Sequence, residues 1–194
     1  MEIVFIRHGQ GEHTLNPPNS LKIMDANITD KGRVQAKALF ETYPLNQQDL
    51  IIVSPTRRTI QTALYWSKTI ECEIIVHPAV GPRMFPMLPA SRAFPCDQLL
   101  SKEKIEVDFP QVSIYQVNSI TWEQGINTLS EEEFTAIAED FMEWCIELNK
   151  SRLFIVSHDG TITSYRQFLG ESNLTRKDFL GETGSYIAKF DGRK

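Results

Sequence analysis

The sequence lacks the features of several protein classes. Its three cysteines, Cys72, Cys96 and Cys145, are widely spaced, which fits neither a disulfide framework nor a CxxC metal pair, so we expect reduced, structural thiols. No run approaches the roughly 18 apolar residues that a membrane span needs. Residues 1–7 lack the basic flank and cleavage site of a signal peptide. These absences predict a soluble, cytoplasmic protein.

Positive charge is also scarce. The chain has 20 Lys and Arg against 25 Asp and Glu, a formal net charge of −5, and no basic run resembles a polybasic arm. We therefore expect neither nucleic acid nor a membrane as a partner. The 41% of hydrophobic and 23% of charged residues are ordinary globular usage, which excludes a disordered or fibrous chain. A length of 194 residues predicts one domain, residues 1–194.

Four short apolar runs are spaced along the chain, at residues 2–6, 50–53, 73–76 and 153–156. Nearly continuous apolar runs of this length are typical of strands that are covered on both faces, as in a largely parallel sheet. Helical patterns lie between the runs. Alternation of strands and helices predicts an α/β sandwich.

Helix starts are marked by capping residues. Thr29 is expected to cap one helix. Ser54, followed by Pro55 in the first helical position, is expected to cap a second helix that continues through Lys68. Ser130 and the acidic residues after it form a capping box for a third. By contrast, residues 77–129 are rich in proline and show little periodicity, which predicts a lid or insertion.

Cationic and imidazole groups follow three of the apolar runs directly. They are Arg7 and His8, the segment 54–58, and the segment 157–160, which contains His158. Ligands of open α/β sheets bind at the carboxyl ends of the strands, so the three segments are expected to meet in one crevice. Arg57 and Arg58 lie in the first turn of a predicted helix, where the helix dipole disfavours cations. A bound anion would offset that cost, and arginine matches phosphate oxygens, so we expect a phosphoryl ligand.

At these positions the sequence resembles the histidine phosphatase superfamily, also called the phosphoglycerate mutase-like family. Residues 7–13 (RHGQGEH) resemble its signature, and residues 28–36 (ITDKGRVQA) its LTxxGxxQA helix. Residues 54–63 (SPTRRTIQTA) resemble its SPxxRxxQTA element, and residues 156–160 (VSHDG) its second histidine segment. The motifs follow the order of the family. The resemblance implies a three-layer α/β/α sandwich with a mostly parallel central sheet.

The resemblance also implies roles for single residues. His8 would be the nucleophile, with Arg7, Arg58 and His158 around the phosphate, whereas Arg57 falls on a variable position outside the pocket. Two guanidinium groups beside His8 lower its pKa, which keeps the imidazole neutral and nucleophilic, and they stabilise the charge of the transition state. Further substrate contacts are expected from Gln10, Gly11, Thr14 and Arg83, with Arg83 and Arg92 holding a second anionic group. Neither a metal nor another cofactor is expected.

The sequence departs from the family pattern twice. Thr14 stands where the first motif usually has Asn, so the hydrogen bond of that amide falls to a hydroxyl, to Asn16, or to no group. Pro82 stands where the mutase branch has its proton-donating Glu. His158 and Asp159 resemble the His-Asp pair of the acid phosphatase and phytase branch, which makes Asp159 the expected general acid. Asp97 and Glu123 are alternatives, and Asp159 is also suited to capping the helix that follows.

The function expected from this resemblance is a metal-independent phosphatase that hydrolyses small phosphate monoesters through a phosphohistidine on His8. One alternative is a phosphoglycerate mutase-type transferase, which must protect a bisphosphate intermediate from water and which usually retains the Glu that Pro82 replaces. Another is a catalytically inactive protein that binds phosphorylated ligands. The sequence leaves the natural substrate and the oligomeric state open.

Overall fold

The protein forms a six-stranded sheet that is parallel except at one edge. The computed structural model describes residues 1–116 and 121–190. The strand order is β4-β3-β2-β5-β1-β6, and only β6 runs antiparallel to its neighbour, β1. The strands are β1 (Glu2–Arg7), β2 (Leu50–Val53), β3 (Glu73–Val76), β4 (Ser113–Ile114), β5 (Arg152–Ser157) and β6 (Ser185–Lys189).

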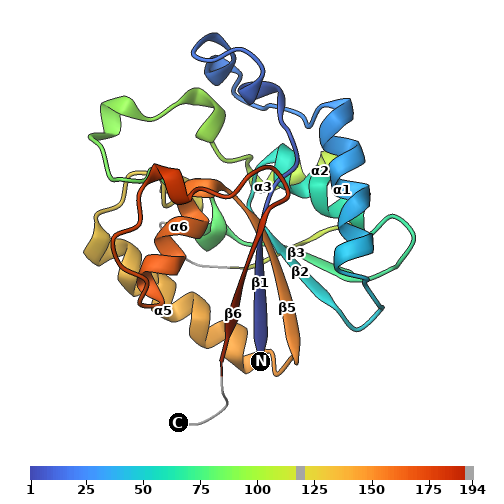
Figure 1. The fold of residues 1–194 in the computed structure, drawn as a ribbon. Coiled ribbons are helices and arrows are strands. Elements are labelled where there is room, and N and C mark those ends of the chain that lie inside the picture. Colours follow the sequence, from blue (N-terminus) through green and yellow to red (C-terminus); the bar gives the residue numbers. More distant parts are fainter. Residues whose placement is uncertain (117–120, 191–194) are drawn as a thin grey trace.

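Helices cover both faces of the sheet (Figure 1). Successive strand residues point to opposite faces, and the core divides accordingly. Val4, Ile6 and Phe154 pack with residues of the helices on one face, and Ile3 and Phe5 pack with residues of the helices on the other. The first face carries α1 (Asp30–Thr42), α2 (Arg57–Trp66) and α3 (Lys102–Asp108), and the second carries α5 (Glu131–Glu147) and α6 (Asp159–Phe168). The predicted three-layer α/β/α sandwich is confirmed.

Local sequence signals give most of the element boundaries. All four predicted strands are present. The Thr29 hydroxyl accepts a hydrogen bond from the Gly32 amide at the start of α1, and Ser130 forms the predicted capping box with Glu133. The prediction for Ser54 is wrong, because α2 begins at Arg57 and the residue before it is Thr56.

The predicted lid over residues 77–129 is too broad. Part of this segment belongs to the sandwich: α3 buries Ile105, and β4 adds a strand beside β3. The short helix α4 (Thr121–Gln124) follows. The remainder, residues 82–99, we call the cap segment. It contains two single 3-10 turns (Ala90–Arg92 and Pro95–Asp97) and lies beyond the carboxyl ends of the strands, in green in Figure 1.

In the described part of the chain, no helix combines the length and the apolar character that would let it cross a bilayer. Cys72, Cys96 and Cys145 are all free thiols. Burial raises the pKa of the Cys96 thiol to about 12, which keeps it protonated and unreactive at neutral pH.

Candidate active site

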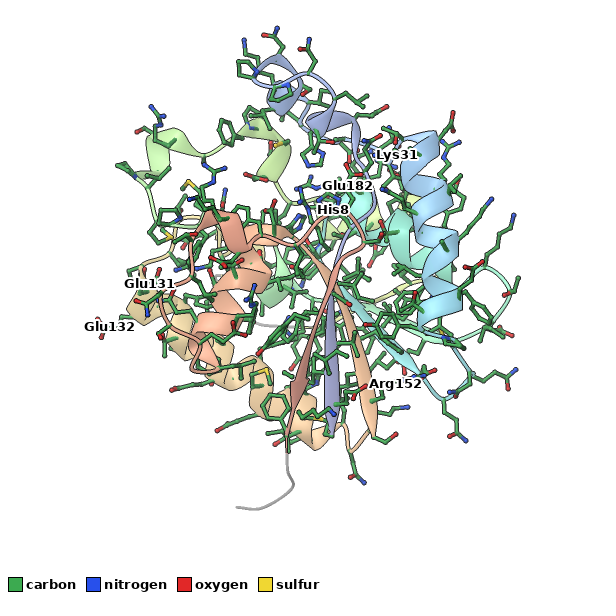
Figure 2. All side chains as sticks on the ribbon, in the orientation of Figure 1. His8, Lys31, Glu131, Glu132, Arg152 and Glu182 are labelled. Carbon is green, nitrogen blue, oxygen red and sulfur yellow. The ribbon has the colours of Figure 1, made fainter. Side chains whose placement is uncertain are left out.

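A cavity of about 310 Å³ opens at the carboxyl ends of β1 and β5. Its wall brings together the four residues predicted to hold phosphate, which are Arg7, His8, Arg58 and His158. Arg7 is the last residue of β1, His8 follows it, and His158 follows β5 in the same way. Figure 2 shows His8 at this end of the sheet, beneath the loops that cross it. The parallel register therefore assembles the site from segments about 150 residues apart.

The His8 imidazole is held in one tautomer. Its Nδ1 lies 2.7 Å from the Gly9 carbonyl oxygen. A carbonyl oxygen only accepts hydrogen bonds, so Nδ1 carries the proton and Nε2 keeps its lone pair. Burial, reinforced by the charge of Arg58 and by the nearby His13 and Arg7, lowers the pKa of His8 well below its usual value. The unprotonated Nε2 is therefore the form present at neutral pH.

Each of the two arginines is anchored by its terminal nitrogens. Arg7 donates from Nη1 to the Leu180 carbonyl at 2.6 Å and pairs through Nη2 with Asp159 Oδ2 at 3.0 Å. Arg58 donates from Nη1 to the Cys96 carbonyl at 2.6 Å, and its Nη2 lies 3.4 Å from Asp97 Oδ1. These contacts fix both guanidinium planes before any ligand arrives.

Each guanidinium also has a buried N–H group without a partner in the described part of the chain. Arg7 Nε and Arg58 Nε are buried, and neither has a hydrogen-bond partner among the described residues. A buried N–H group without a partner costs about 1–3 kcal/mol and is rare in native proteins. Both residues line the cavity with His8. Two fixed, charged donors without acceptors beside a neutral imidazole are suited to binding a tetrahedral oxyanion.

His158 connects Arg58 to Ser54. The His158 Nδ1 lies 3.2 Å from Arg58 Nη2, and its Nε2 lies 2.8 Å from Ser54 Oγ. Because a guanidinium can only donate, Nδ1 is the acceptor and the proton lies on Nε2, which donates to the Ser54 hydroxyl. Burial and the charge of Arg58 lower the pKa of His158 well below its usual value. Ser54, which the sequence suggested as a helix cap, is thus a positioning residue of the site.

The other predicted contacts of the first motif are mostly structural. Gln10 and Gly11 are not part of the cavity wall. The Gln10 side chain accepts a hydrogen bond from Thr29, at the start of α1. Thr14 does line the cavity, and its hydroxyl donates to the Gly11 carbonyl at 2.8 Å, while Asn16 is exposed. The hydroxyl at position 14 therefore closes the turn that shapes the wall.

Arg83, whose guanidinium was expected to hold a second anionic group, is part of the cavity wall, but its guanidinium is held by contacts within the protein. Nη1 donates to the carbonyls of Ile126 and Leu129 at 3.0 and 2.8 Å, and Nη2 lies 3.3 Å from Glu131 Oε1. The guanidinium also lies over the Phe134 ring, 4.3 Å from its centroid. Figure 2 places Glu131 at the start of α5, far from His8. Arg83 ties the loop after β3 to α5.

Two other arginines line the cavity and are exposed. Arg92, on the cap segment, was expected there, whereas Arg176 comes from the C-terminal quarter of the chain and was missed. Arg57, predicted to lie outside, pairs instead with Asp25 and Asp108. The ion pair with Asp108 connects α2 to α3.

Three carboxyl groups were candidates for the proton donor, and they differ in position. Asp97 and Asp159 line the cavity, whereas Glu123 is exposed and lines an adjoining cavity beside α4 that Asp97 also lines. Burial raises the pKa of Asp97, although the charge of Arg58 opposes this. Asp159 is the first residue of α6, and its Oδ1 accepts from the Gly160 amide at 2.7 Å while Oδ2 pairs with Arg7. Their place in the same wall as His8 therefore favours the two aspartates over Glu123.

One residue of the cavity wall was not predicted to belong to the site. His13 is 7% exposed and its ring lies 5.2 Å from that of His8. Burial, with the charges of Arg58 and Arg7, lowers the pKa of His13 to about 3.

Among the described residues no three His, Cys, Asp or Glu side chains are grouped as ligands of a metal ion would be.

Together, the fold and the cavity define an α/β protein with a cationic site at the carboxyl ends of its parallel strands. Residues 3–85 match the sequence model of the histidine phosphatase superfamily (branch 1). This match covers the part of the chain that carries Arg7, His8 and Arg58. A search of curated protein sequences finds no match.

Solved structures of phosphatases share the fold. A mycobacterial glucosyl-3-phosphoglycerate phosphatase, solved with VO3, is 19% identical, with a TM-score of 0.60 over 96% of this chain and 91% of that one. The phosphoserine phosphatase of Entamoeba histolytica, solved with 3-phosphoglyceric acid, is 18% identical, with a TM-score of 0.60 over 96% and 89%. The ecdysone phosphate phosphatase of Bombyx mori, solved with tungstate, is 13% identical, with a TM-score of 0.64 over 96% of this chain and 87% of that one. These structures support the fold assignment across almost the whole chain.

Proposed function

We propose that the protein is a metal-independent phosphatase that hydrolyses phosphate monoesters through a phosphohistidine on His8. The observation that carries the proposal is the pair of buried, unpartnered Nε–H groups of Arg7 and Arg58 in the wall that also holds His8. These donors would bind the phosphoryl oxygens and stabilise the charge that develops on them in the transition state.

The reaction has two steps. His8 Nε2 attacks phosphorus, a P–N bond forms, and the P–O bond to the leaving group breaks as that oxygen takes a proton from a carboxylic acid. Water then attacks phosphorus, the P–N bond breaks and inorganic phosphate leaves, while the proton released by water returns to the carboxylate. The arginines hold the phosphoryl group in place during both steps.

For the proton donor, the contacts favour Asp97 over Asp159. A general acid must hold a proton at the working pH, and burial raises the pKa of Asp97. Asp159, the residue first expected, instead uses one oxygen to orient Arg7 and the other to accept a backbone amide. Asp97 would thus supply the proton that the family Glu, replaced here by Pro82, supplies in the mutase branch.

The substrate class follows from the rest of the wall. The cap segment contributes Phe85, Leu88, Phe94 and Arg92, and the C-terminal segment contributes Arg176 and Phe179. A volume of about 310 Å³ is at the small end for ligand cavities. We therefore propose a small ester with an apolar portion and a second anionic group. Phosphoserine and glucosyl-3-phosphoglycerate, which the names of two neighbours contain, also carry a carboxylate.

A panel of phosphate esters, assayed with and without EDTA, tests the proposal. The wild-type protein should release phosphate in both conditions, and His8→Ala should abolish the release. A brief acid-free quench should also leave an acid-labile, base-stable phosphoryl group on the wild-type chain. Transfer between 2- and 3-phosphoglycerate without net hydrolysis would favour the mutase instead. Tight vanadate binding without turnover of any ester would favour the inactive binding protein.

A further inference from the structure

His13 is a third imidazole in the wall of the cavity, and neither the sequence motifs nor the proposed reaction gives it a role. Its side chain is buried and forms part of the same wall as His8, Arg7 and Arg58. Its Nδ1 is buried without a hydrogen-bond partner, and no hydrogen bond from the ring is present among the described residues. The position of this imidazole is therefore not explained by hydrogen bonding within the protein.

The backbone around His13 is also held in place without the imidazole ring. The His13 carbonyl accepts from the Ser20 hydroxyl at 2.7 Å, and the Glu12 carboxylate accepts from the Asn27 amide at 2.9 Å. The Thr14 hydroxyl closes the turn. These contacts hold residues 12–14 through groups other than the imidazole.

Gly11 makes the room that the ring occupies. A Cβ atom at residue 11 would lie 2.5 Å from His13 Nδ1 and 2.7 Å from Cε1, closer than real Cβ contacts come. The φ of Gly11 is −106°, which any residue adopts, so the backbone conformation does not require glycine here. The missing side chain does have a consequence, because only glycine lets the imidazole lie against residue 11.

This placement decides which edge of the ring can meet a ligand. The Nδ1–Cε1 edge lies over Gly11, and the opposite edge, with Nε2, is the one left for the cavity. The His13 pKa of about 3 keeps the imidazole neutral. A neutral imidazole has one N–H, and a proton on Nε2 directs it to the cavity while leaving only a lone pair at the buried Nδ1.

We propose that His13 is a phosphate-binding residue, that its Nε2–H donates a hydrogen bond to a phosphoryl oxygen, and that Gly11 is the seat that makes this possible. The inference rests on the proposed function. It adds a third donor to those of Arg7 and Arg58, on a ring whose centroid lies 5.2 Å from that of His8. The donor is uncharged, so it binds an oxyanion without adding to the positive charge that keeps His8 neutral.

The test uses orthovanadate binding by calorimetry at neutral pH, together with kcat/KM for p-nitrophenyl phosphate. His13→Phe keeps a ring but removes the donor, and should weaken vanadate binding and lower kcat/KM by roughly 10- to 100-fold, as expected for one hydrogen bond to a charged group. His13→Gln keeps an amide N–H near the Nε2 position and should recover most of both. Gly11→Ala should match His13→Phe, because its methyl group displaces the ring. In the His13→Gln background Gly11→Ala should cost clearly less, since the two changes act through one contact.

His77→Phe is the matched control. His77 is also buried, with a pKa of about 3, but it stacks on Tyr115 and does not line the cavity. Its replacement should leave the vanadate affinity unchanged. A His13→Phe protein that is folded and binds vanadate within about twofold of wild type would overturn the inference. If the wild-type protein neither binds vanadate nor turns over any ester, it is the proposed function itself that fails.

Discussion

The Nε2–H of His158 donates to Ser54 Oγ over 2.8 Å, at the point where β2 ends. This hydrogen bond sets the ring so that Nδ1 faces Arg58 Nη2. Ser54 therefore orients Arg58 indirectly, through the His158 imidazole.

The first prediction concerns this relay, by which we mean the hydrogen bonds that link Ser54 through His158 to Arg58. Ser54→Ala should lower kcat/KM for p-nitrophenyl phosphate by roughly 5- to 10-fold, the value of about one neutral hydrogen bond, because His158 loses its anchor. Ser157→Ala is the control, since Ser157 is equally buried but donates to the Val80 carbonyl. It should lower the free energy of unfolding by about 1 kcal/mol and leave kcat/KM of the folded protein unchanged. Equal kinetic losses in both variants would contradict the relay.

The second prediction separates the two aspartates. If Asp97 is the general acid, Asp97→Asn should slow hydrolysis of alkyl phosphates by ~10² or more, while p-nitrophenyl phosphate, whose leaving group needs little protonation, is largely spared. Asp159→Asn, which loosens Arg7, should slow both substrates by similar factors.

The pH dependence of kcat/KM gives a second test of the role of Asp97. Burial raises the Asp97 pKa, so the protonated, active form is present at low pH and is lost as the pH rises through that value. The profile of kcat/KM for an alkyl phosphate should fall on its alkaline side, and Asp97→Asn should remove that fall. A leaving-group dependence found in Asp159→Asn instead would return the role to Asp159.

The third prediction concerns the second anionic group. Arg92→Ala and Arg176→Ala should each raise KM for a phosphate ester that carries a carboxylate by roughly 2- to 5-fold, since an exposed ion pair is worth up to about 1 kcal/mol. KM for p-nitrophenyl phosphate should not change. Arg33→Ala, which removes an exposed arginine paired with Asp30 on α1, serves as the charge-matched control. A KM increase of the same size for both substrates would argue against a subsite.

The fourth prediction is a loss of stability in acid. Burial lowers the pKa of His77 from 6.5 to about 3 in the folded protein. The unfolded chain therefore binds one more proton than the folded one between these values, and stability falls as the pH falls through that window. The expected slope is about 1.4 kcal/mol per pH unit from this residue, and none above pH 6.5.

Denaturant unfolding across this range checks the slope. His77→Phe should make the decline shallower by about one proton, although the variant can be less stable at every pH. Ser157→Ala should shift the whole curve and keep its slope. An unchanged slope in His77→Phe would mean that His77 does not stay neutral in the folded protein.

The sequence was a good guide where local signals decide the outcome. Apolar runs located the four main strands, and the hydroxyls of Thr29 and Ser130 located two helix starts, because a strand covered on both faces and a helix cap each need particular residues in a short window. The two strands that were missed depend on their neighbours. β4 has two residues, and β6 is an edge strand with a mixed burial pattern.

The directions of the site side chains could not be predicted from the sequence, because contacts with distant segments determine them. Arg83 follows a predicted strand, as the other site residues do, yet its guanidinium turns onto carbonyls about 45 residues further along. Arg176 reaches the cavity from a segment with no motif. Gly11 and His13 lie two residues apart in the first motif, but only the structure shows that the His13 ring lies against Gly11.

The segment 180–184 lies along the carboxyl end of β1, and its position has a consequence for truncated forms of the protein. The Arg7 side chain donates to the Leu180 carbonyl, the Arg7 amide donates to the Gly184 carbonyl, and Lys31 pairs with Glu182 at 3.2 Å. Arg7 and Leu180 are 173 residues apart in the sequence. A fragment cut before residue 180 should therefore lose the contacts that hold Arg7, and with them the proposed phosphate site.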